Sequence, residues 1–176
     1  MRRTPRLLRE AALTLGVAAV VVLAVQAWML RDATPHWRED GPLAWVLPDG
    51  SEGRGTLSDL RARLGATDTP VALYVWATWC PICDAMDDQV DALARTRPVL
   101  TVATRSGDAA AVRRHLATRG LRWVVVFDAN GHLADRHGWR SVPMFSVLMP
   151  DGTLRHTTVG YTTGWGLRLR LWLAGH

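Results

Sequence analysis

The chain has 176 residues, of which 21 are arginine, none is lysine and 16 are acidic, so its formal net charge is +5. Residues 1–30 carry +3 of this charge, and residues 31–176, with 17 arginines and 15 acids, carry +2. Residues 31–176 are therefore nearly balanced in charge. They show neither a stripe of basic residues that could follow a phosphate backbone nor a recognisable nucleic-acid module, so no nucleic-acid partner is expected. Residues 31–176 are long enough for one domain with one substantial core.

The N-terminus combines a basic stretch with a long apolar run. Residues 1–10 contain four arginines and one acid, and the twenty residues Ala11–Leu30 include only Thr14 and Gln26 as appreciably polar members. Twenty apolar residues can span a bilayer as a helix. Because basic residues favour the cytoplasmic side, we expect a single-pass membrane anchor, with residues 1–10 cytoplasmic and everything after Leu30 exported.

A cleaved signal peptide is the competing interpretation, since Val25-Gln26-Ala27 offers small residues to a signal peptidase. The apolar run is longer than the usual hydrophobic region of about 7 to 15 residues, so an uncleaved anchor is favoured. In both cases the domain reaches an oxidising compartment, where a cysteine pair must be recharged by a partner to act as a reductant. Residues 31–40 mix charges with Pro35 and are predicted to tether a domain at residues 41–176.

The domain alternates predicted strands and helices, which favours an α/β fold with parallel strands and right-handed crossovers. Strands are predicted at Leu43–Leu47, Val71–Trp76, Val99–Ala103 and Trp123–Phe127, and a hairpin at Met144–Met149 and Thr153–Val159. Helices are predicted from about Thr56, capped by Thr56 or Ser58, over Pro81–Thr96, and over Asp108–Arg119 before Gly120. Leucine and arginine alternate from Leu167 onward, and this period of two over Leu167–Trp172 favours a strand.

Tryptophan is frequent, with nine residues in the chain. Trp45, Trp123 and Trp172 stand in periodic apolar segments and are predicted to be core residues. Trp28 stands where an aromatic residue marks the bilayer interface. Trp79 precedes the first cysteine, and we expect it to be partly exposed and to shape a groove for a partner.

The only two cysteines, Cys80 and Cys83, stand in the stretch WATWCPIC, between an apolar run and a helix-like segment. At the mouth of a helix, unpaired backbone amides and the helix dipole stabilise a Cys80 thiolate, which predicts that Cys80 is the nucleophile. Pro81 suits the first helical position. Cys83, one turn further, is then the resolving thiol that attacks a mixed disulfide between Cys80 and a partner.

An isolated Cys-x-x-Cys pair also forms half of many zinc sites, so metal binding is an alternative. A structural zinc ion needs about four ligands, and no second cysteine pair exists. Histidines could complete a site, but they are scattered: His36, His115, His132, His137, His156 and His176. The proline in the loop and the flanking aromatic residues fit catalysis better than a zinc site or a purely structural disulfide, so no metal ion and no cofactor are predicted.

The stretch VALYVWATWCPICDAM resembles the strand, active-site loop and first helix of thioredoxin-like proteins, specifically the membrane-tethered TlpA-like branch of bacterial envelope proteins. WATWCPIC together with GYTTGWGLRLRLWLAGH resembles, more narrowly, the copper-sensitivity suppressor D group of anchored periplasmic thiol–disulfide oxidoreductases. The resemblance covers residues 41–174. It implies a central mixed β-sheet flanked by helices after one transmembrane helix, and a C-terminal helix in place of the strand favoured by the period of two.

The resemblance also implies a second part of the site. Pro143 matches a family proline that is cis and lies against the cysteine pair, whereas only about 5–6% of X-Pro bonds in folded proteins are cis. Its expected role is to present the Val142 backbone to an extended partner segment, as in strand addition. The predicted site therefore comprises Cys80 and Cys83 as catalytic residues, and Trp79, Val142 and Pro143 as substrate-binding residues.

Two positions depart from the family pattern. Thioredoxins carry a buried acid six residues before the first active-site cysteine, and here that residue is Tyr74. Many TlpA-like reductants place a glutamate three residues after the second cysteine, and here that residue is Met86. Asp84 and Asp87 are nearby in sequence but are expected to face solvent. The sequence leaves open which group accepts the proton of Cys83 and in which direction electrons flow.

We therefore expect a membrane-anchored periplasmic thiol–disulfide oxidoreductase that acts on protein thiols or disulfides. The resemblance implies a reductant, recharged by an inner-membrane electron donor of the disulfide-reductase type, with a link to copper tolerance. One alternative is a reductant for the haem-binding cysteines of apocytochrome c. The other is a Cu(I) chaperone in which Cys80 and Cys83 are soft ligands, assisted by Met144 or Met86.

Overall fold

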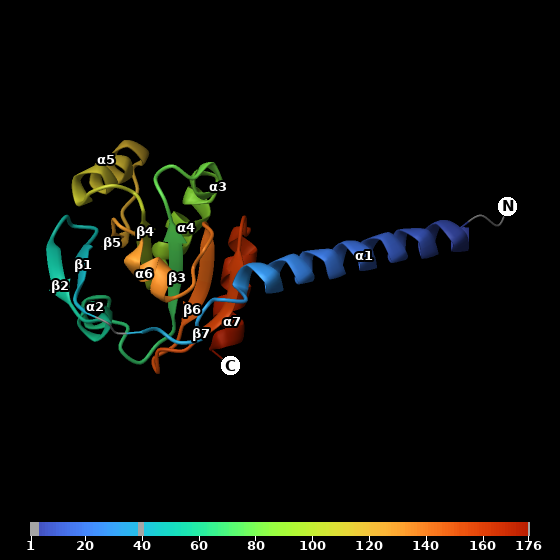
Figure 1. Ribbon diagram of the computed structural model, residues 1–176, viewed down its shortest axis with the longest axis horizontal. Helices are drawn as coiled ribbons and strands as arrows, with labels where there is room; N and C mark the ends of the chain where they lie inside the picture. Colours follow the sequence, from blue (N-terminus) through green and yellow to red (C-terminus); the bar gives the residue numbers. More distant parts are fainter. Residues whose placement is uncertain (1–3, 39–40, 176) are drawn as a thin grey trace.

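The apolar N-terminal segment forms one long helix, α1 (Thr4–Leu30), which projects from the rest of the molecule (Figure 1). The computed structural model describes residues 4–38 and 41–175. Among these residues, one helix is long and apolar enough to cross a membrane, at Leu8–Leu30, and its apolar stretch is not buried inside the protein. A signal sequence near the N-terminus can have the same length and composition. Helix α1 is therefore a candidate for either a membrane span or a signal sequence.

Seven strands form one mixed sheet with the order β2-β1-β5-β4-β3-β6-β7. The strands are β1 (Leu43–Val46), β2 (Glu52–Gly55), β3 (Val71–Trp76), β4 (Val99–Thr104), β5 (Val124–Asp128), β6 (Met144–Leu148) and β7 (Leu154–Val159). The neighbours β3, β4 and β5 are parallel, and the other pairs are antiparallel. The expected central mixed sheet flanked by helices is confirmed.

Within the described residues the structure has six further helices: α2 (Leu57–Arg63), α3 (Pro81–Asp84), α4 (Asp87–Ala94), α5 (Ala109–Arg119), α6 (His132–Arg136) and α7 (Gly164–Ala174). Their ends follow local signals. Thr56 and Asp59 form a capping box at the start of α2. Asp108 caps α5, and Gly120 ends it in the left-handed conformation that glycine adopts without strain. These boundaries agree with the sequence predictions.

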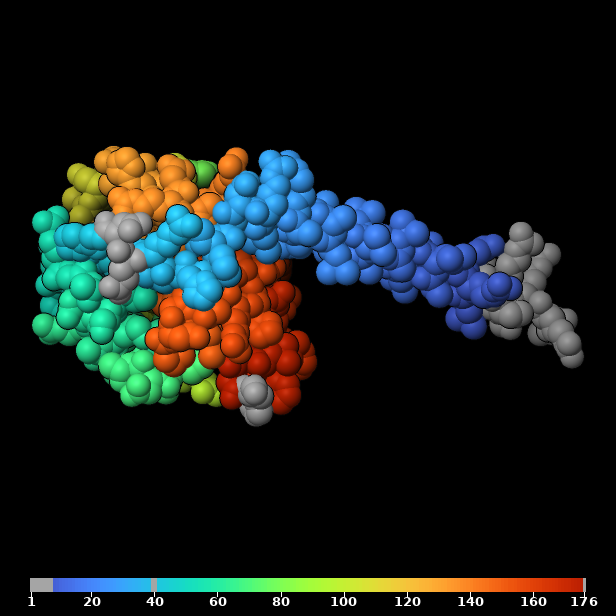
Figure 2. Space-filling view, turned by 60° about the horizontal axis from the view of Figure 1, so that its bottom comes forward, coloured from blue at the N-terminus to red at the C-terminus, as the bar shows by residue number. Residues whose placement is uncertain are grey.

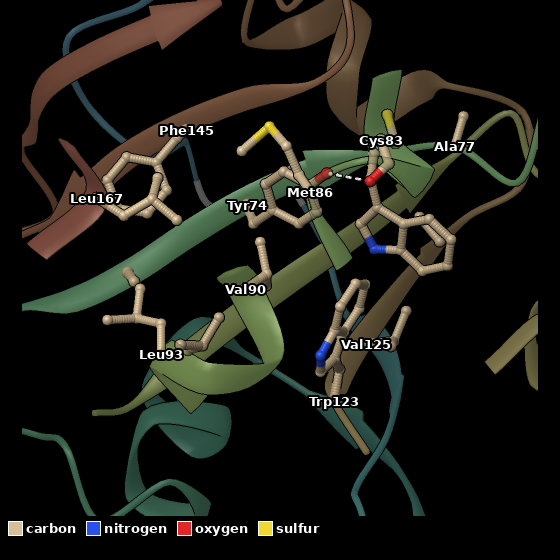
Figure 3. Close-up of a cluster of buried hydrophobic side chains, with 14 of the residues drawn as sticks. Tyr74, Ala77, Cys83, Met86, Val90, Leu93, Trp123, Val125, Phe145 and Leu167 are labelled. Carbon is tan, nitrogen blue, oxygen red and sulfur yellow. Dashed lines mark hydrogen bonds between the residues drawn. The ribbon is translucent and has the colours of Figure 1, made fainter. Parts of the chain in front are cut away.

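Both faces of the sheet are covered, so β3 is buried at every position. One cluster gathers side chains from α4, α5 and α7 around Tyr74, Trp76 and Trp123 (Figure 3). The other gathers side chains from α2 and α6 around Leu73 and Val75. Alternate residues of β3 therefore anchor both layers, which holds its carboxyl end, where the cysteine loop begins, in a rigid frame.

Two sequence predictions differ from the structure, and at a third segment the family resemblance is correct where the local pattern is not. The helix expected over Pro81–Thr96 is divided into α3 and α4, and Met86 precedes the second helix. The pattern over Leu167–Trp172 is helical, as the family resemblance implied, and not a strand. Trp172 is 59% exposed on α7, so the prediction that it is a core residue is wrong, whereas Trp45 and Trp123 are buried.

Strand β2 and helix α6 were not predicted. The sequence of β2 is Glu-Gly-Arg-Gly, which contains no apolar residue and therefore lacks the strand pattern. Both glycines have a packing role, because a Cβ atom built on Gly53 would lie 2.5 Å from Nε1 of Trp45. The indole of Trp45 thus packs directly on the backbone of β2, a contact that local sequence does not encode.

Residues 31–38, which follow α1, lie on the domain surface (Figure 2). Trp37 is 8% exposed, and its ring lies 5.0 Å from that of His137 and 5.9 Å from that of Trp139. The backbone N–H of Thr34 donates to the carbonyl of His137, and that of Leu154 donates to Pro35. Residues 31–38 of the expected tether therefore pack on the domain, and residues 39–40 lie outside the described residues.

Candidate functional site

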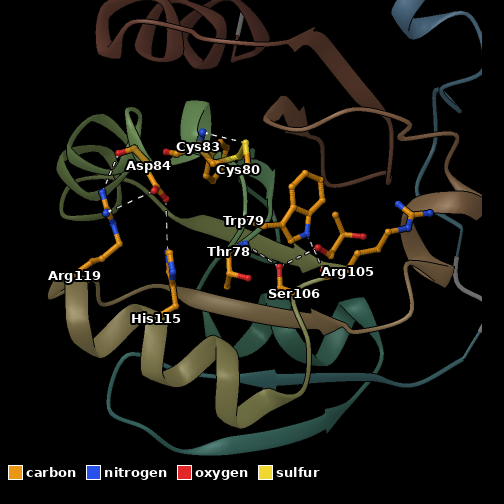
Figure 4. The surroundings of a disulfide bond; sticks show 11 residues. Thr78, Trp79, Cys80, Cys83, Asp84, Arg105, Ser106, His115 and Arg119 are labelled. Carbon is orange, nitrogen blue, oxygen red and sulfur yellow. Dashed lines mark hydrogen bonds and ion pairs between the residues drawn. A yellow bond between two sulfur atoms is a disulfide. The ribbon is translucent and has the colours of Figure 1, made fainter.

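The two cysteines lie where β3 passes into α3, and they form a disulfide bond with a Cα–Cα distance of 5.2 Å (Figure 4). Cys80 is the N-cap of α3, Pro81 is in its first turn, and the Sγ atom of Cys80 accepts from the backbone N–H of Cys83 at 3.1 Å. This donor and the helix mouth favour negative charge on Cys80. Cys80 is 5% exposed and Cys83 1%, so both residues are buried and Cys83 is the more buried of the two.

Hydrogen bonds fasten the loop before Cys80 to the end of β4. The backbone N–H of Thr78 donates to Oγ of Ser106 at 3.0 Å, and Ser106 donates to the carbonyl of Thr104 at 2.9 Å. The indole Nε1–H of Trp79 donates to the carbonyl of Arg105 at 2.8 Å. Trp79 is nevertheless 61% exposed, as expected, so its ring is oriented by one hydrogen bond while its face remains accessible.

Sequence reasoning missed Arg105 and Ser106. A signal was present, because both follow directly after the buried strand β4, which is parallel to β3 and pairs with it. The carboxyl ends of adjacent parallel strands meet at one edge of a sheet, so residues just after β4 must lie beside the cysteine loop.

The predicted proline lies at the same end of the sheet as the cysteines. The Val142–Pro143 peptide bond is cis, as the resemblance implied. Met144 pairs with Val75, so Pro143 stands beside the carboxyl end of β3. The carbonyl of Pro143 accepts from the backbone N–H of Gly160 at 2.8 Å, which joins the start of β6 to the residue after β7.

Tyr74 and Met86 occupy the positions at which related proteins carry acids, and both are fully buried (Figure 3). The phenol O–H of Tyr74 donates to the carbonyl of Cys83 at 3.5 Å. Burial raises the pKa of Tyr74 far above its usual value, and the nearby Asp87 and Asp84 charges raise it further. Tyr74 therefore stays protonated at neutral pH and does not act as a base for Cys83.

An ionic group that includes Asp84, His115 and Arg119 lies beside Cys83 (Figure 4). The expectation that both acids face solvent is wrong for Asp87, which is 5% exposed and ion-paired with Arg119. Arg119 also lies 3.8 Å from Asp84, and Nε2 of His115 lies 4.0 Å from the Asp84 carboxylate. Burial raises the pKa of Asp87, although the hydrogen bond and charge of Arg119 act in the opposite direction.

The three ligand-type side chains Asp84, Asp87 and His115 have donor atoms within 4.8 Å of one another. Both carboxylates are already paired with Arg119, so a guanidinium occupies the position that a cation would take. The group is therefore an ion-pair network that joins α3 and α4 to α5.

A mixed sheet with a Cys-x-x-Cys disulfide at the junction of a central strand and a helix, next to a cis-proline, defines the class of thioredoxin-like thiol–disulfide oxidoreductases. Residues 46–164 match the Redoxin family. Because this match covers more than half of the chain, the chain belongs to the Redoxin family.

Known proteins agree with this assignment. A thioredoxin-like protein of Haemophilus influenzae is 33% identical over 125 residues, which are 68% of this chain and 74% of the relative. The soluble secreted antigen MPT53 of Mycobacterium tuberculosis is 30% identical over 87 residues, 48% of this chain and 50% of that protein.

Two solved structures have the same fold. The exposed lipoprotein thioredoxin Etrx1 of Streptococcus pneumoniae superposes with a TM-score of 0.58 at 26% identity, covering 76% of this chain and 99% of that one. A secreted disulfide oxidoreductase of Mycobacterium tuberculosis has a TM-score of 0.56 at 23% identity, covering 74% and 94%.

Proposed function

We propose that this protein is a membrane-tethered periplasmic thiol–disulfide oxidoreductase that exchanges disulfides with protein substrates through Cys80 and Cys83. The observation that carries the proposal is the disulfide between an N-cap cysteine and a shielded cysteine one turn further on. A two-step exchange needs such a pair, because the first cysteine must react with the partner and the second must then attack the mixed disulfide.

The reaction starts from the reduced enzyme. The Cys80 thiolate attacks one sulfur of a substrate disulfide, which forms a mixed disulfide and releases the other substrate sulfur as a thiolate. The Cys83 thiolate then attacks Sγ of Cys80, which breaks the mixed disulfide and releases the second substrate sulfur. Two electrons pass from the enzyme pair to the substrate, and the reverse sequence oxidises a substrate dithiol.

Trp79, Val142 and Pro143 are proposed to bind the substrate segment around its sulfur. Pro143 lies beside the end of β3, and Val142 directly precedes it in the chain. Trp79 adds an exposed aromatic face held by Arg105. An extended segment that pairs with the Val142 backbone would bring its sulfur toward Cys80, as in strand addition.

The tether is proposed to be α1, uncleaved and spanning the inner membrane. Its length and composition support a span, and the four arginines in residues 1–10 support a cytoplasmic N-terminus. The relatives described as a secreted antigen and as an exposed lipoprotein support a domain outside the cytoplasm. In that compartment the pair acts as a reductant only when an inner-membrane donor of the disulfide-reductase type recharges it.

Within the family, we assign the chain to the TlpA-like branch and to the copper-sensitivity suppressor D group. The support is the resemblance of WATWCPIC and of the C-terminal stretch GYTTGWGLRLRLWLAGH. This assignment carries a role in copper tolerance, in which thiols misoxidised by copper are restored. Repair of apocytochrome c thiols is the related role that uses the same chemistry.

The proposed exchange is tested by trapping. Cys83→Ala removes the resolving thiol, so mixed disulfides through Cys80 should accumulate in the envelope and disappear on reduction. The double variant Cys80→Ala/Cys83→Ala is the matched control and should trap nothing. If the folded Cys83→Ala protein yields no more adducts than the double variant, the proposed function is rejected.

A further inference from the structure

Helix α7 has two apolar faces: the inner face packs into the core, and the outer face is largely exposed to solvent. Its inner residues Leu167, Leu171 and Ala174 belong to the core cluster that includes α4 and β6. Its outer stripe, at positions i, i+4, i+7 and i+8, is exposed: Trp165 72%, Leu169 36%, Trp172 59% and Leu173 44%. A helix on the surface of a soluble domain has a polar outer face, so this contiguous apolar stripe points to a further contact.

Helices α1 and α7 lie on the same side of the domain. The side-chain amide of Gln26 donates to the carbonyl of Val159 at 2.7 Å and accepts from its N–H at 3.0 Å. Val159 ends β7, the edge strand against which α7 also packs. In Figure 1, α1 leaves the domain beside α7, which runs across the line of α1, and the turned view of Figure 2 again places them on one side.

The level of the membrane surface follows from the same contact. The 20 residues from Ala11 to Leu30 rise about 30 Å as a helix, which matches the hydrocarbon thickness of about 30 Å. Gln26 lies four residues before the end of this run and is bound to β7, so the edge of the domain at Val159 lies at the level of the membrane surface. Trp28 is 63% exposed, with the guanidinium of Arg31 lying 5.1 Å from its ring, and this pair suits the interface.

We propose that the outer stripe of α7, Trp165, Leu169, Trp172 and Leu173, lies in the interfacial region of the bilayer that α1 spans. This proposal rests on the proposed anchor and adds a second membrane contact to it. The occupant is lipid for two reasons: the stripe has two tryptophans, which favour the headgroup level, and α7 contains Arg168 and Arg170 but no acidic residue. Arg168 is exposed beside the stripe, where it meets lipid phosphates.

Two contacts, α1 and α7, restrict rotation of the domain about the anchor. The residue after Val159, Gly160, donates to the carbonyl of Pro143, so the membrane-facing edge is joined directly to the proposed substrate-binding loop. The site is then held at a constant height and direction above the bilayer. Substrates are accepted when their disulfides come close to the membrane surface.

The test places the photoreactive residue p-benzoylphenylalanine in the full chain, reconstituted into vesicles of phosphatidylethanolamine and phosphatidylglycerol. One label replaces Leu169 on α7. A second replaces Val20 on α1, which reports on the anchor itself. A third replaces Ala62, an exposed residue of α2, which lies on the far side of the domain from α1 (Figure 1).

Lipid adducts are expected at positions 20 and 169, with at least a tenfold lower yield at 62. Adducts at 20 but not at 169 would overturn the α7 contact and leave the anchor standing. Adducts at neither position would reject the anchor, and the α7 contact with it. Crosslinks from 169 to a second copy of the chain, or equal yields at 169 and 62, would also overturn the proposal.

Discussion

The side chain of Gln26 pairs with both the N–H and the carbonyl of Val159, 133 residues away in the sequence. Gln26 is one of the two appreciably polar residues in the apolar run, and it pairs with both backbone groups of the last residue of the edge strand β7. The pair therefore fixes the long helix to the catalytic domain and covers the end of this edge strand.

Gln26→Leu should remove both hydrogen bonds and leave α1 as apolar as before. Each bond contributes about 0.5–1.5 kcal/mol, so the domain should lose about 1–3 kcal/mol of unfolding free energy. Chemical denaturation in detergent micelles measures this loss. Thr14→Leu is the matched control, because Thr14 bonds only within its helix and should change stability little. Equal effects of the two variants would contradict the coupling.

Ser106→Ala should loosen the cysteine loop. It removes the acceptor of the Thr78 N–H and the donor to Thr104, and a half-buried amide left without a partner costs about 1–3 kcal/mol. Slower disulfide exchange with a model substrate such as insulin is expected as well. Ser58→Ala, at an exposed position of α2, serves as the control. Unchanged stability and exchange rate in Ser106→Ala would show that the loop does not need this support.

Arg119→Leu should change how stability depends on pH. Burial raises the pKa of Asp87 in the folded state above the ordinary value of 3.8. At pH values between 3.8 and the pKa in the folded state, the folded protein therefore binds more protons than the unfolded protein. Stability contributed by the neutral form is therefore present below 3.8 and is lost as pH rises through the folded pKa. In Arg119→Leu the pKa of Asp87 rises further, so the stability that is lost as the pH rises should become larger.

Unfolding free energies of Arg119→Leu and the wild type, measured from pH 4 to pH 8, check this expectation. The variant should lose progressively more stability than the wild type as pH increases. Arg114→Leu, at an exposed position of the same helix, is the control for removing one positive charge. A constant difference between Arg119→Leu and wild type across the range would contradict burial of an ionised Asp87.

The redox potential distinguishes the proposed reductant from the other candidate chemistries. Equilibration with glutathione buffers should give a two-electron potential near that of thioredoxin, about −270 mV, whereas an oxidant lies near −120 mV. A Cu(I) chaperone would instead bind one copper ion per reduced pair. Stoichiometric copper retention without a measurable potential would contradict the proposed oxidoreductase.

Much of the site could be predicted because its signals are local. A buried apolar run followed by Cys80 and Pro81 specifies a strand, a turn and a helix start, and the structure places the pair there. Thr56, Asp108 and Gly120 likewise mark helix ends by their own backbone chemistry. The cis bond before Pro143 followed only from the family resemblance, since the local sequence favours trans.

The features that local sequence did not predict depend on partners distant along the chain. Leu167–Trp172 alternates as a strand would, but α7 is helical, with Leu167 and Leu171 packed into the core and Trp172 turned outward. Asp87 is buried because Arg119, 32 residues later, arrives beside it. Trp37 is buried because His137 and Trp139 form its pocket.

By itself, the sequence determined the chemistry: a Cys80–Cys83 pair at a helix start, an apolar segment long enough to cross a bilayer, and an α/β fold. These depend on composition and short-range spacing, which a single chain segment carries. Only the tertiary structure decided the pairing of Gln26 with Val159, the burial of Asp87 and the side of the domain on which α7 exposes its tryptophans. Such contacts depend on strand order and on how helices dock, and neither is encoded within one segment.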